Sequence, residues 1–264
     1  MMPRLDSSLA WKTATRLVSN NREVLMAIAG VFFLLPGLIG AVVLPRPEFG
    51  KGMTDQQMAE TILQFYGDAL PVLLALSIPL MLGFMVMLKV MLDPARPTVG
   101  SAIRRCLRLL PSYLGAHILS TLSLSMFWLL MVAVLSSILS PVVAVLFSLI
   151  VLTVPASRLV LVTPEIIVSE VLNPLRAVAN SVQGTRGNYG RILSYFGPAL
   201  VLFMVIYGLT MIFVGVILDQ TTDGDVKHLL GEGIIGVLFA AGYTYLAAMV
   251  GSVWLQLMAP KQAA

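Results

Sequence analysis

Residues 109–157 read LLPSYLGAHILSTLSLSMFWLLMVAVLSSILSPVVAVLFSLIVLTVPAS, a run of 49 residues without Asp, Glu, Lys or Arg. One charge at the centre of a bilayer costs roughly 2.5–3.5 kcal/mol, so a run of this length is typical of polypeptide that lies in lipid. It is also much longer than the about 20 residues that one spanning helix needs. Ser136, Ser137, Ser140 and Pro141 interrupt it, so we predict two helices, 114–135 and 142–162.

Four further stretches have the length and composition of membrane spans: Val24–Leu44, Ala69–Leu88, Ile192–Leu218 and Gly233–Ala259. The whole chain is 11% charged and 58% hydrophobic, with a mean hydropathy of +0.92, whereas a soluble domain has about 25% charged residues. The sequence therefore predicts an all-α polytopic membrane protein with six transmembrane helices, organised as a single integral membrane domain over residues 1–264.

The basic residues indicate how the six helices are oriented. When the spans alternate across the membrane, three basic residues lie on one side (Arg46, Lys51 and Lys227) and fourteen lie on the side that holds both termini. Basic residues near span ends favour the cytoplasm. We therefore expect both termini to be cytoplasmic, and the acidic loops around 48–68 and 219–232 to face the periplasm or the exterior.

Each pair of spans is preceded by a segment with the pattern of a short amphipathic helix. In the clearest copy, residues 98–110 lie between Pro97 and Pro111, with Val99, Ile103, Cys106, Leu107 and Leu110 on one face and the arginines on the other. The copy at 173–184 has Asn173 as a candidate cap, and a weaker copy covers 6–19. This predicts three parallel units, about 5–92, 98–163 and 173–260.

The basic side chains of these helices are candidate contacts for anionic lipid headgroups: Arg104, Arg105, Arg108, Lys12 and Arg16. A basic helix with one apolar face, next to a membrane span, is expected to lie in the interface. The alternative is a helix packed beneath the bundle, where the same residues meet a protein partner. The net charge of +4 does not favour nucleic acid, because the basic residues sit between apolar runs where headgroups would meet them.

From Arg158 onward the sequence RLVLVTPEIIVSEVLNPLRAVANSVQGTRGNYGRILSYF resembles a bacterial membrane domain that is fused to some glycerophosphoryl diester phosphodiesterases, and related six-span proteins of the YciC type. The residues that carry the resemblance form a candidate family-motif loop: Arg158, Pro164, Glu170, Ser181, Gly184, Thr185, Gly187 and Arg191. The resemblance implies an α-helical protein of the bacterial inner membrane, linked to membrane or envelope homeostasis. It does not imply phosphodiesterase chemistry, which belongs to a separate soluble domain.

The sequence contains no nucleophile elbow, phosphate-binding loop or HExxH or CxxC motif, so we expect a protein that is not an enzyme and needs no cofactor or metal. His117 and Arg158 lie near span ends. For His117 we expect a hydrogen-bonded packing role; Arg158 either extends to the interface or pairs with Glu165 or Glu170. A transporter or channel for a small or lipid-like substrate is the alternative function, with Ser120, Ser123 and Ser125 as candidate cavity residues.

Overall fold

The computed structural model describes residues 3–44, 52–221 and 224–259, with the side chains of 217–228 outside that description. Throughout these ranges the chain is helical, with no strand. Six helices are long and apolar enough to cross a membrane: Arg22–Val43, Asp55–Leu92, Val99–Ser136, Pro141–Val168, Tyr189–Val216 and Leu229–Leu257. The predicted all-α fold with six spans is confirmed, and its pattern is that of a multi-pass membrane protein.

The N-terminal third contains α1 (Ser7–Asn20), α2 (Arg22–Ala29), a π-helical turn η1 (Gly30–Leu34), α3 (Leu35–Val43) and α4 (Asp55–Leu92). Asp6 caps α1 by accepting a hydrogen bond from the Leu9 amide at 3.0 Å. Thr54 begins α4 in a capping box with Gln57. The first span is therefore one helical rod, α2–η1–α3, with a π-turn in its middle.

The rest of the chain contains α5 (Val99–Ser136), α6 (Pro141–Leu159), α7 (Val162–Val168), α8 (Pro174–Gly184), α9 (Tyr189–Thr221) and α10 (Gly224–Leu257). The break between α5 and α6 falls where the serines and Pro141 predict it. Asn173 caps α8, as expected, by accepting from the amides of Leu175 and Arg176.

Several helix boundaries differ from the prediction, among them the start of α10, which lies at Gly224 within the expected 219–232 loop. Pro111 does not separate an amphipathic helix from a span, because α5 continues through it as one 38-residue helix. A proline removes one backbone hydrogen bond, and membrane helices tolerate that loss because neighbouring groups satisfy the freed carbonyl. A further difference is at 55–68, which was expected in a loop and forms the first turns of α4.

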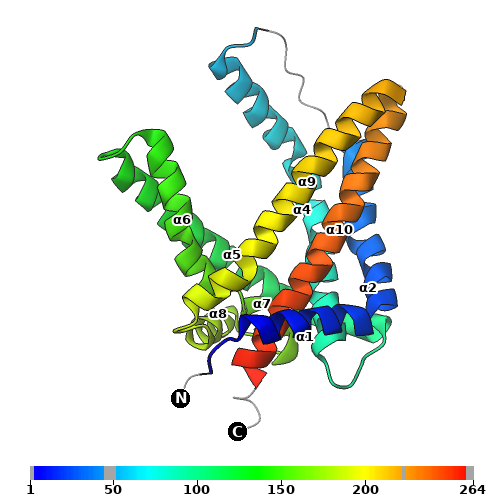
Figure 1. Ribbon diagram of the computed structural model, residues 1–264, viewed down its shortest axis with the longest axis vertical. Helices are drawn as coiled ribbons and strands as arrows, with labels where there is room; N and C mark the ends of the chain where they lie inside the picture. The colour runs from blue at the N-terminus through cyan, green and yellow to red at the C-terminus, as the bar shows by residue number, and fades with distance from the viewer. Residues whose placement is uncertain (1–2, 45–51, 222–223, 260–264) are drawn as a thin grey trace.

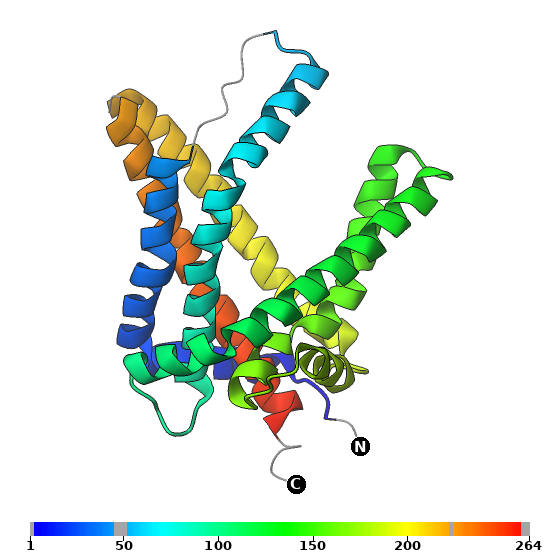
Figure 2. The same ribbon diagram turned by 180° about the vertical axis from the view of Figure 1, so that it is seen from behind.

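Both ends of the chain lie at the same end of the molecule, which we call the basal end; it comprises α1, α7, α8, the 93–98 turn and the start of α5 (Figures 1 and 2). The core is concentrated there. It joins fully buried side chains of four helices, among them Leu88 of α4, Cys106 of α5, Ile166 of α7 and Val253 of α10.

Away from the basal end the helices diverge, and the α5–α6 hairpin leans away from α4 and α10 (Figure 2). The hairpin is joined by a hydrogen bond of 2.9 Å from the Trp128 indole to the Ser148 hydroxyl. In the most apolar 18 residues of α5, and in those of α9, no residue is buried. In a membrane such faces need no protein partner, because lipid tails cover apolar side chains as well as another helix does.

Candidate functional site

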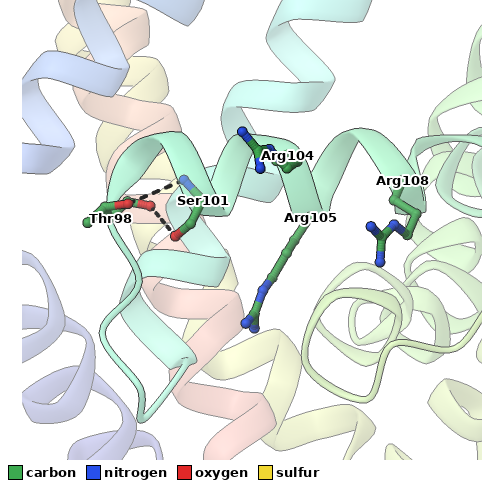
Figure 3. Close-up of a pocket in the computed structure, with 5 residues that line it drawn as sticks. All are labelled: Thr98, Ser101, Arg104, Arg105 and Arg108. Atoms are coloured by element: carbon green, nitrogen blue, oxygen red, sulfur yellow. Dashed lines mark hydrogen bonds between the residues drawn. The ribbon is translucent and has the colours of Figure 1, made fainter.

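A cationic surface lies over the first turns of α5, at the basal end. Thr98 begins this helix and accepts a hydrogen bond from the Ser101 amide at 3.4 Å. Thr98 and Ser101 line a pocket of about 450 Å³ together with Arg104, Arg105 and Arg108. Figure 3 shows the three guanidinium groups spreading out from α5 rather than converging on one point. We call Arg104, Arg105 and Arg108 the arginine surface; its spread suits several anionic groups better than one enclosed phosphate.

The arginines of this surface differ in their electrostatic environment. Arg105 lies 3.5 Å from the Asp93 carboxylate, which also pairs with Lys89 at 3.3 Å. Burial tends to raise the pKa of Asp93, but the Ala95 amide and these two cations outweigh it and hold the pKa below its ordinary value of 3.8. Within the described ranges, Arg104 and Arg108 have no carboxylate within 4.0 Å. Those two side chains therefore carry most of the uncompensated charge.

Lys12 and Arg16, the other candidate headgroup contacts, lie on α1. Both side chains are exposed, whereas Ala10 and Ala14 of the same helix are buried. Helix α1 packs through these small residues against α10. The structure thus places Lys12 and Arg16 at the basal end, as it does the arginine surface, but on a separate element.

In the candidate family-motif loop, Ser181 and Thr185 of α8 bind the end of α6. The Ser181 hydroxyl donates to the Arg158 carbonyl at 2.7 Å and accepts from the Leu161 amide at 3.2 Å. The Thr185 hydroxyl lies 3.5 Å from the same Arg158 carbonyl and 2.9 Å from the Ser181 carbonyl of its own helix. Both side chains are buried. The last carbonyls of a helix have no partner inside it, so these hydroxyls supply the missing hydrogen bonds.

Glu165, directly after Pro164, is the most buried carboxylate among the described residues. It accepts hydrogen bonds from the Asn180 amide at 2.8 Å, the Ser169 hydroxyl at 3.1 Å and the Trp254 indole at 3.4 Å. Three donors from α8, the end of α7 and α10 stabilise the carboxylate in a site where an unpaired charge would be costly. Asn180 and Trp254 could not be identified as its partners from sequence, because they lie 15 and 89 residues away.

Glu170 pairs with Lys89, a cation in the last turn of α4. The Lys89 ammonium group is buried and lies 3.2 Å from a Glu170 carboxylate oxygen and 3.2 Å from the Ile167 carbonyl. Glu170 has a φ of 50°, an uncommon conformation that directs the chain from α7 into α8. The possible pairing of Arg158 with Glu165 or Glu170 is therefore not realised, since both carboxylates have other partners.

The remaining motif residues position the ends of the chain. A Cβ added to Gly184 would lie 2.3 Å from the Met258 sulfur, so α8 and the end of α10 meet at this glycine. Gly187 has a φ of 77°, which favours glycine at the turn into α9. Arg191 donates to the Leu5 carbonyl at 3.2 Å, and Asn188, which the motif did not include, accepts from the Leu5 amide at 2.8 Å.

The motif residues connect neighbouring helices and the N-terminal segment through hydrogen bonds and close packing. We define the basal joint as Lys89, Glu165, Glu170, Ser181, Thr185, Asn188 and Arg191. Backbone groups of α6, α7, α8 and the N-terminal segment bind five of these side chains, Lys89 pairs with Glu170, and neighbouring side chains bind Glu165. Across the described residues no group of three His, Cys, Asp or Glu side chains is placed to hold a metal ion.

The candidate cavity serines and His117 have other surroundings. Ser123 and Ser125 are exposed on α5, and the Ser120 hydroxyl is a buried group without a hydrogen-bond partner in the described part of the chain. His117 is exposed and stacks on Tyr113, with ring centroids 5.9 Å apart.

Comparison of the chain with protein-family models, with curated proteins and with solved structures finds no match.

Proposed function

We propose that this chain is a non-enzymatic protein of the bacterial inner membrane that binds anionic lipid headgroups at its basal end and acts in membrane or envelope organisation or homeostasis. In this proposal both termini, and with them the basal end, face the cytoplasm. The observation that carries the proposal is the arginine surface: three exposed guanidinium groups within five residues, two of them without a carboxylate partner in the described ranges, at the start of a membrane-spanning helix. A position of this kind meets phosphates of the leaflet surface.

The exposed apolar side chains of the basal helices support interfacial placement. Helix α8 buries small residues and exposes Leu175 and Val182, and Leu172 just before the helix is also exposed. Helix α1 exposes Leu9 and Trp11. Large apolar side chains next to basic ones suit the boundary between headgroups and acyl chains. In this proposal the chain consists of three parallel two-span units, about 5–92, 98–163 and 173–260, and each begins with one of these basal helical segments.

The proposed relation to the membrane domain of glycerophosphoryl diester phosphodiesterases is supported by the motif residues. Serine, threonine and glycine at 181–187 each have a specific packing or hydrogen-bonding role in the basal joint. Such roles explain why a membrane protein without catalytic chemistry would contain this pattern. They also make the basal joint the element that holds the arginine surface at a fixed depth, through the Lys89–Asp93–Arg105 chain of ion pairs.

Lipid binding by the full-length protein in detergent micelles tests the proposal. Native mass spectrometry would compare phosphatidylglycerol with phosphatidylcholine of the same acyl chains. Each basic residue near an anionic surface contributes about 1 kcal/mol, so R104Q/R108Q should weaken phosphatidylglycerol binding by about 30-fold. R105Q should have a smaller effect, because Asp93 already compensates this charge.

The charge-preserving variant R104K/R108K is the matched control and should retain most of the preference for phosphatidylglycerol. If R104Q/R108Q binds both lipids as the unchanged protein does, the arginine surface is not a headgroup site. If the lysine variant loses binding as fully as the glutamine variant, geometry rather than charge is responsible, and the electrostatic proposal is wrong.

The alternative, transport of a lipid-like substrate, is favoured by one observation. A largely apolar groove of about 460 Å³ lies between α3, α4 and α10 and does not involve the arginine surface. Reconstituted vesicles that carry a fluorescent lipid in one leaflet test this alternative. Faster movement of the lipid between leaflets than in protein-free vesicles would support transport, and an equal rate would argue against it.

A further inference from the structure

A half-open groove between α3, α4 and α10 is the second distinctive feature of the molecule. Its volume is about 460 Å³ and its lining is mostly apolar, with Pro36, Gly37 and Gly40 from α3, leucines from α4, and Phe239 and Tyr243 from α10. The three helices all belong to candidate membrane spans. An apolar ligand site in this position would open to lipid rather than to water.

Small residues and the π-turn shape the groove. A Cβ added to Gly40 would lie 3.2 Å from a Leu76 methyl group, so α3 and α4 meet closely there. One added to Gly236 would lie 2.8 Å from a Leu34 methyl group, so the π-turn and α10 also meet closely. Between them, Gly37 has no atom within 4 Å of an added Cβ, which leaves open space. The π-turn Gly30–Leu34 lies directly before this region, and such turns are frequent at functional sites.

One carboxylate lines the groove. Glu232 lies in the fourth position of the apolar stretch Leu229–Leu257, where the sequence analysis had assigned it to a loop. Glu232 is half-buried, and no cationic side chain of the described residues lies within 4.0 Å of its carboxylate. An ionisable residue that lines an apolar groove at the end of a span is a candidate contact for a ligand headgroup.

The groove has the depth of one leaflet. Glu232 and Tyr243 are eleven residues apart on α10, which corresponds to about 16 Å along the helix axis. The hydrocarbon core is about 30 Å thick, so this distance is about half of it. Tyr243 stacks on Phe33 with ring centroids 4.9 Å apart, and this pair lies at the deep end of the groove. Helix α10 runs from the end of the molecule away from the basal end toward the basal end (Figure 1). Glu232 belongs to the first third of this helix, where headgroups of that leaflet would be.

We propose that the groove binds one acyl chain of a lipid from the leaflet opposite the basal end, and that the lipid headgroup carries a primary ammonium group that pairs with Glu232. The apolar lining receives the chain down to the Phe33–Tyr243 pair. The carboxylate supplies the charge complementarity, since a phosphate-only headgroup such as glycerol phosphate would be repelled by it. This site is independent of the arginine surface, which lies at the other end of the molecule and prefers anionic groups.

Photo-crosslinking of the full-length protein in nanodiscs tests the proposal. The probe is phosphatidylethanolamine with a diazirine on one acyl chain, compared with phosphatidylglycerol that carries the same labelled chain. Phosphatidylethanolamine should label peptides of α3 and α10 around the groove. E232Q keeps the shape of the site and removes the charge. It should reduce the preference for phosphatidylethanolamine by about tenfold, which corresponds to the lower end of the free energy that a hydrogen bond to a charged group contributes.

Gly37→Leu fills the groove where the structure has space, and it should abolish labelling by both lipids. Gly208→Leu on α9, which also has no atom within 4 Å of an added Cβ, is the matched control and should leave labelling unchanged. Equal labelling by the two lipids in the unchanged protein would overturn the headgroup assignment. Labelling that survives Gly37→Leu would overturn the acyl-chain site. R104Q/R108Q should not affect this labelling, so the two proposals fail separately.

Discussion

Replacing Lys89 with Met tests whether the basal joint stabilises the fold. The lysine is 4% exposed, and its ammonium group is placed 3.2 Å from the Ile167 carbonyl, 3.2 Å from Glu170 and 3.3 Å from Asp93. Met has a similar length and no charge. The variant therefore removes three interactions without leaving a large cavity.

The three interactions differ in value. The Ile167 carbonyl lies in the buried part of the joint, and a buried acceptor without its donor costs about 1–3 kcal/mol. Glu170 contributes little, because its side chain is 55% exposed and an exposed pair is worth about 0–1 kcal/mol. Asp93 keeps Arg105 and the Ala95 amide as partners. Against these losses, Met avoids the cost of removing an ammonium group from water. Because this saving offsets part of the cost, the expected net loss is about 1–2 kcal/mol of the free energy of unfolding.

Equilibrium unfolding in mixed micelles with increasing SDS would measure this loss by circular dichroism. Glu170→Gln is the matched control, since it removes only the exposed partner and should cost less than about 1 kcal/mol. The double variant K89M/E170Q should then be close to K89M alone. If K89M costs no more than Glu170→Gln, the buried contacts of Lys89 do not stabilise the protein, and the description of the basal joint as a structural element is wrong.

Three further predictions concern packing, capping and pH. Gly83→Ala should destabilise the protein by about 1–3 kcal/mol, because the added Cβ would lie 2.4 Å from the Phe32 Cβ. Gly208→Ala is the control, since its added Cβ meets open space and should not destabilise the protein. Unfolding curves of the two variants that coincide would contradict this prediction. Ser181→Ala should cost about 1–3 kcal/mol through the unpaired Arg158 carbonyl and Leu161 amide, and increased proteolysis at the α6–α7 junction would accompany it. Because the pKa of Asp93 is lowered in the folded protein, its stabilising contribution is present above its ordinary pKa of 3.8 and is lost as the pH falls below that value. Asp93→Asn should therefore reduce the loss of unfolding free energy that the unchanged protein shows at acidic pH. An equal loss in the variant would contradict the role of the Asp93 ion pairs.

The sequence alone was sufficient for the spans and for their main break. Insertion of a helix into lipid depends on the summed hydropathy of about 20 neighbouring residues, so it is a local property that a single chain reveals. The cap at Asn173 and the interruption between Ser136 and Pro141 were predicted for the same reason, since both depend on adjacent residues. Pro111 was misread because a proline that breaks a helix in water is tolerated in a membrane helix.

The contacts of the basal joint and the groove were decided by the tertiary structure. Lys89 counted in the sequence as one more interfacial cation, and Glu165 as a possible partner of Arg158; folding buried both among groups up to 89 residues distant. Glu232 was assigned to a loop because a carboxylate next to an apolar run is usually taken as the end of the span. Only the packing of α3, α4 and α10 places it in a groove. Hydropathy determines that a residue enters the membrane, but the partners of a polar group there depend on which helices meet, and that is a property of the whole chain.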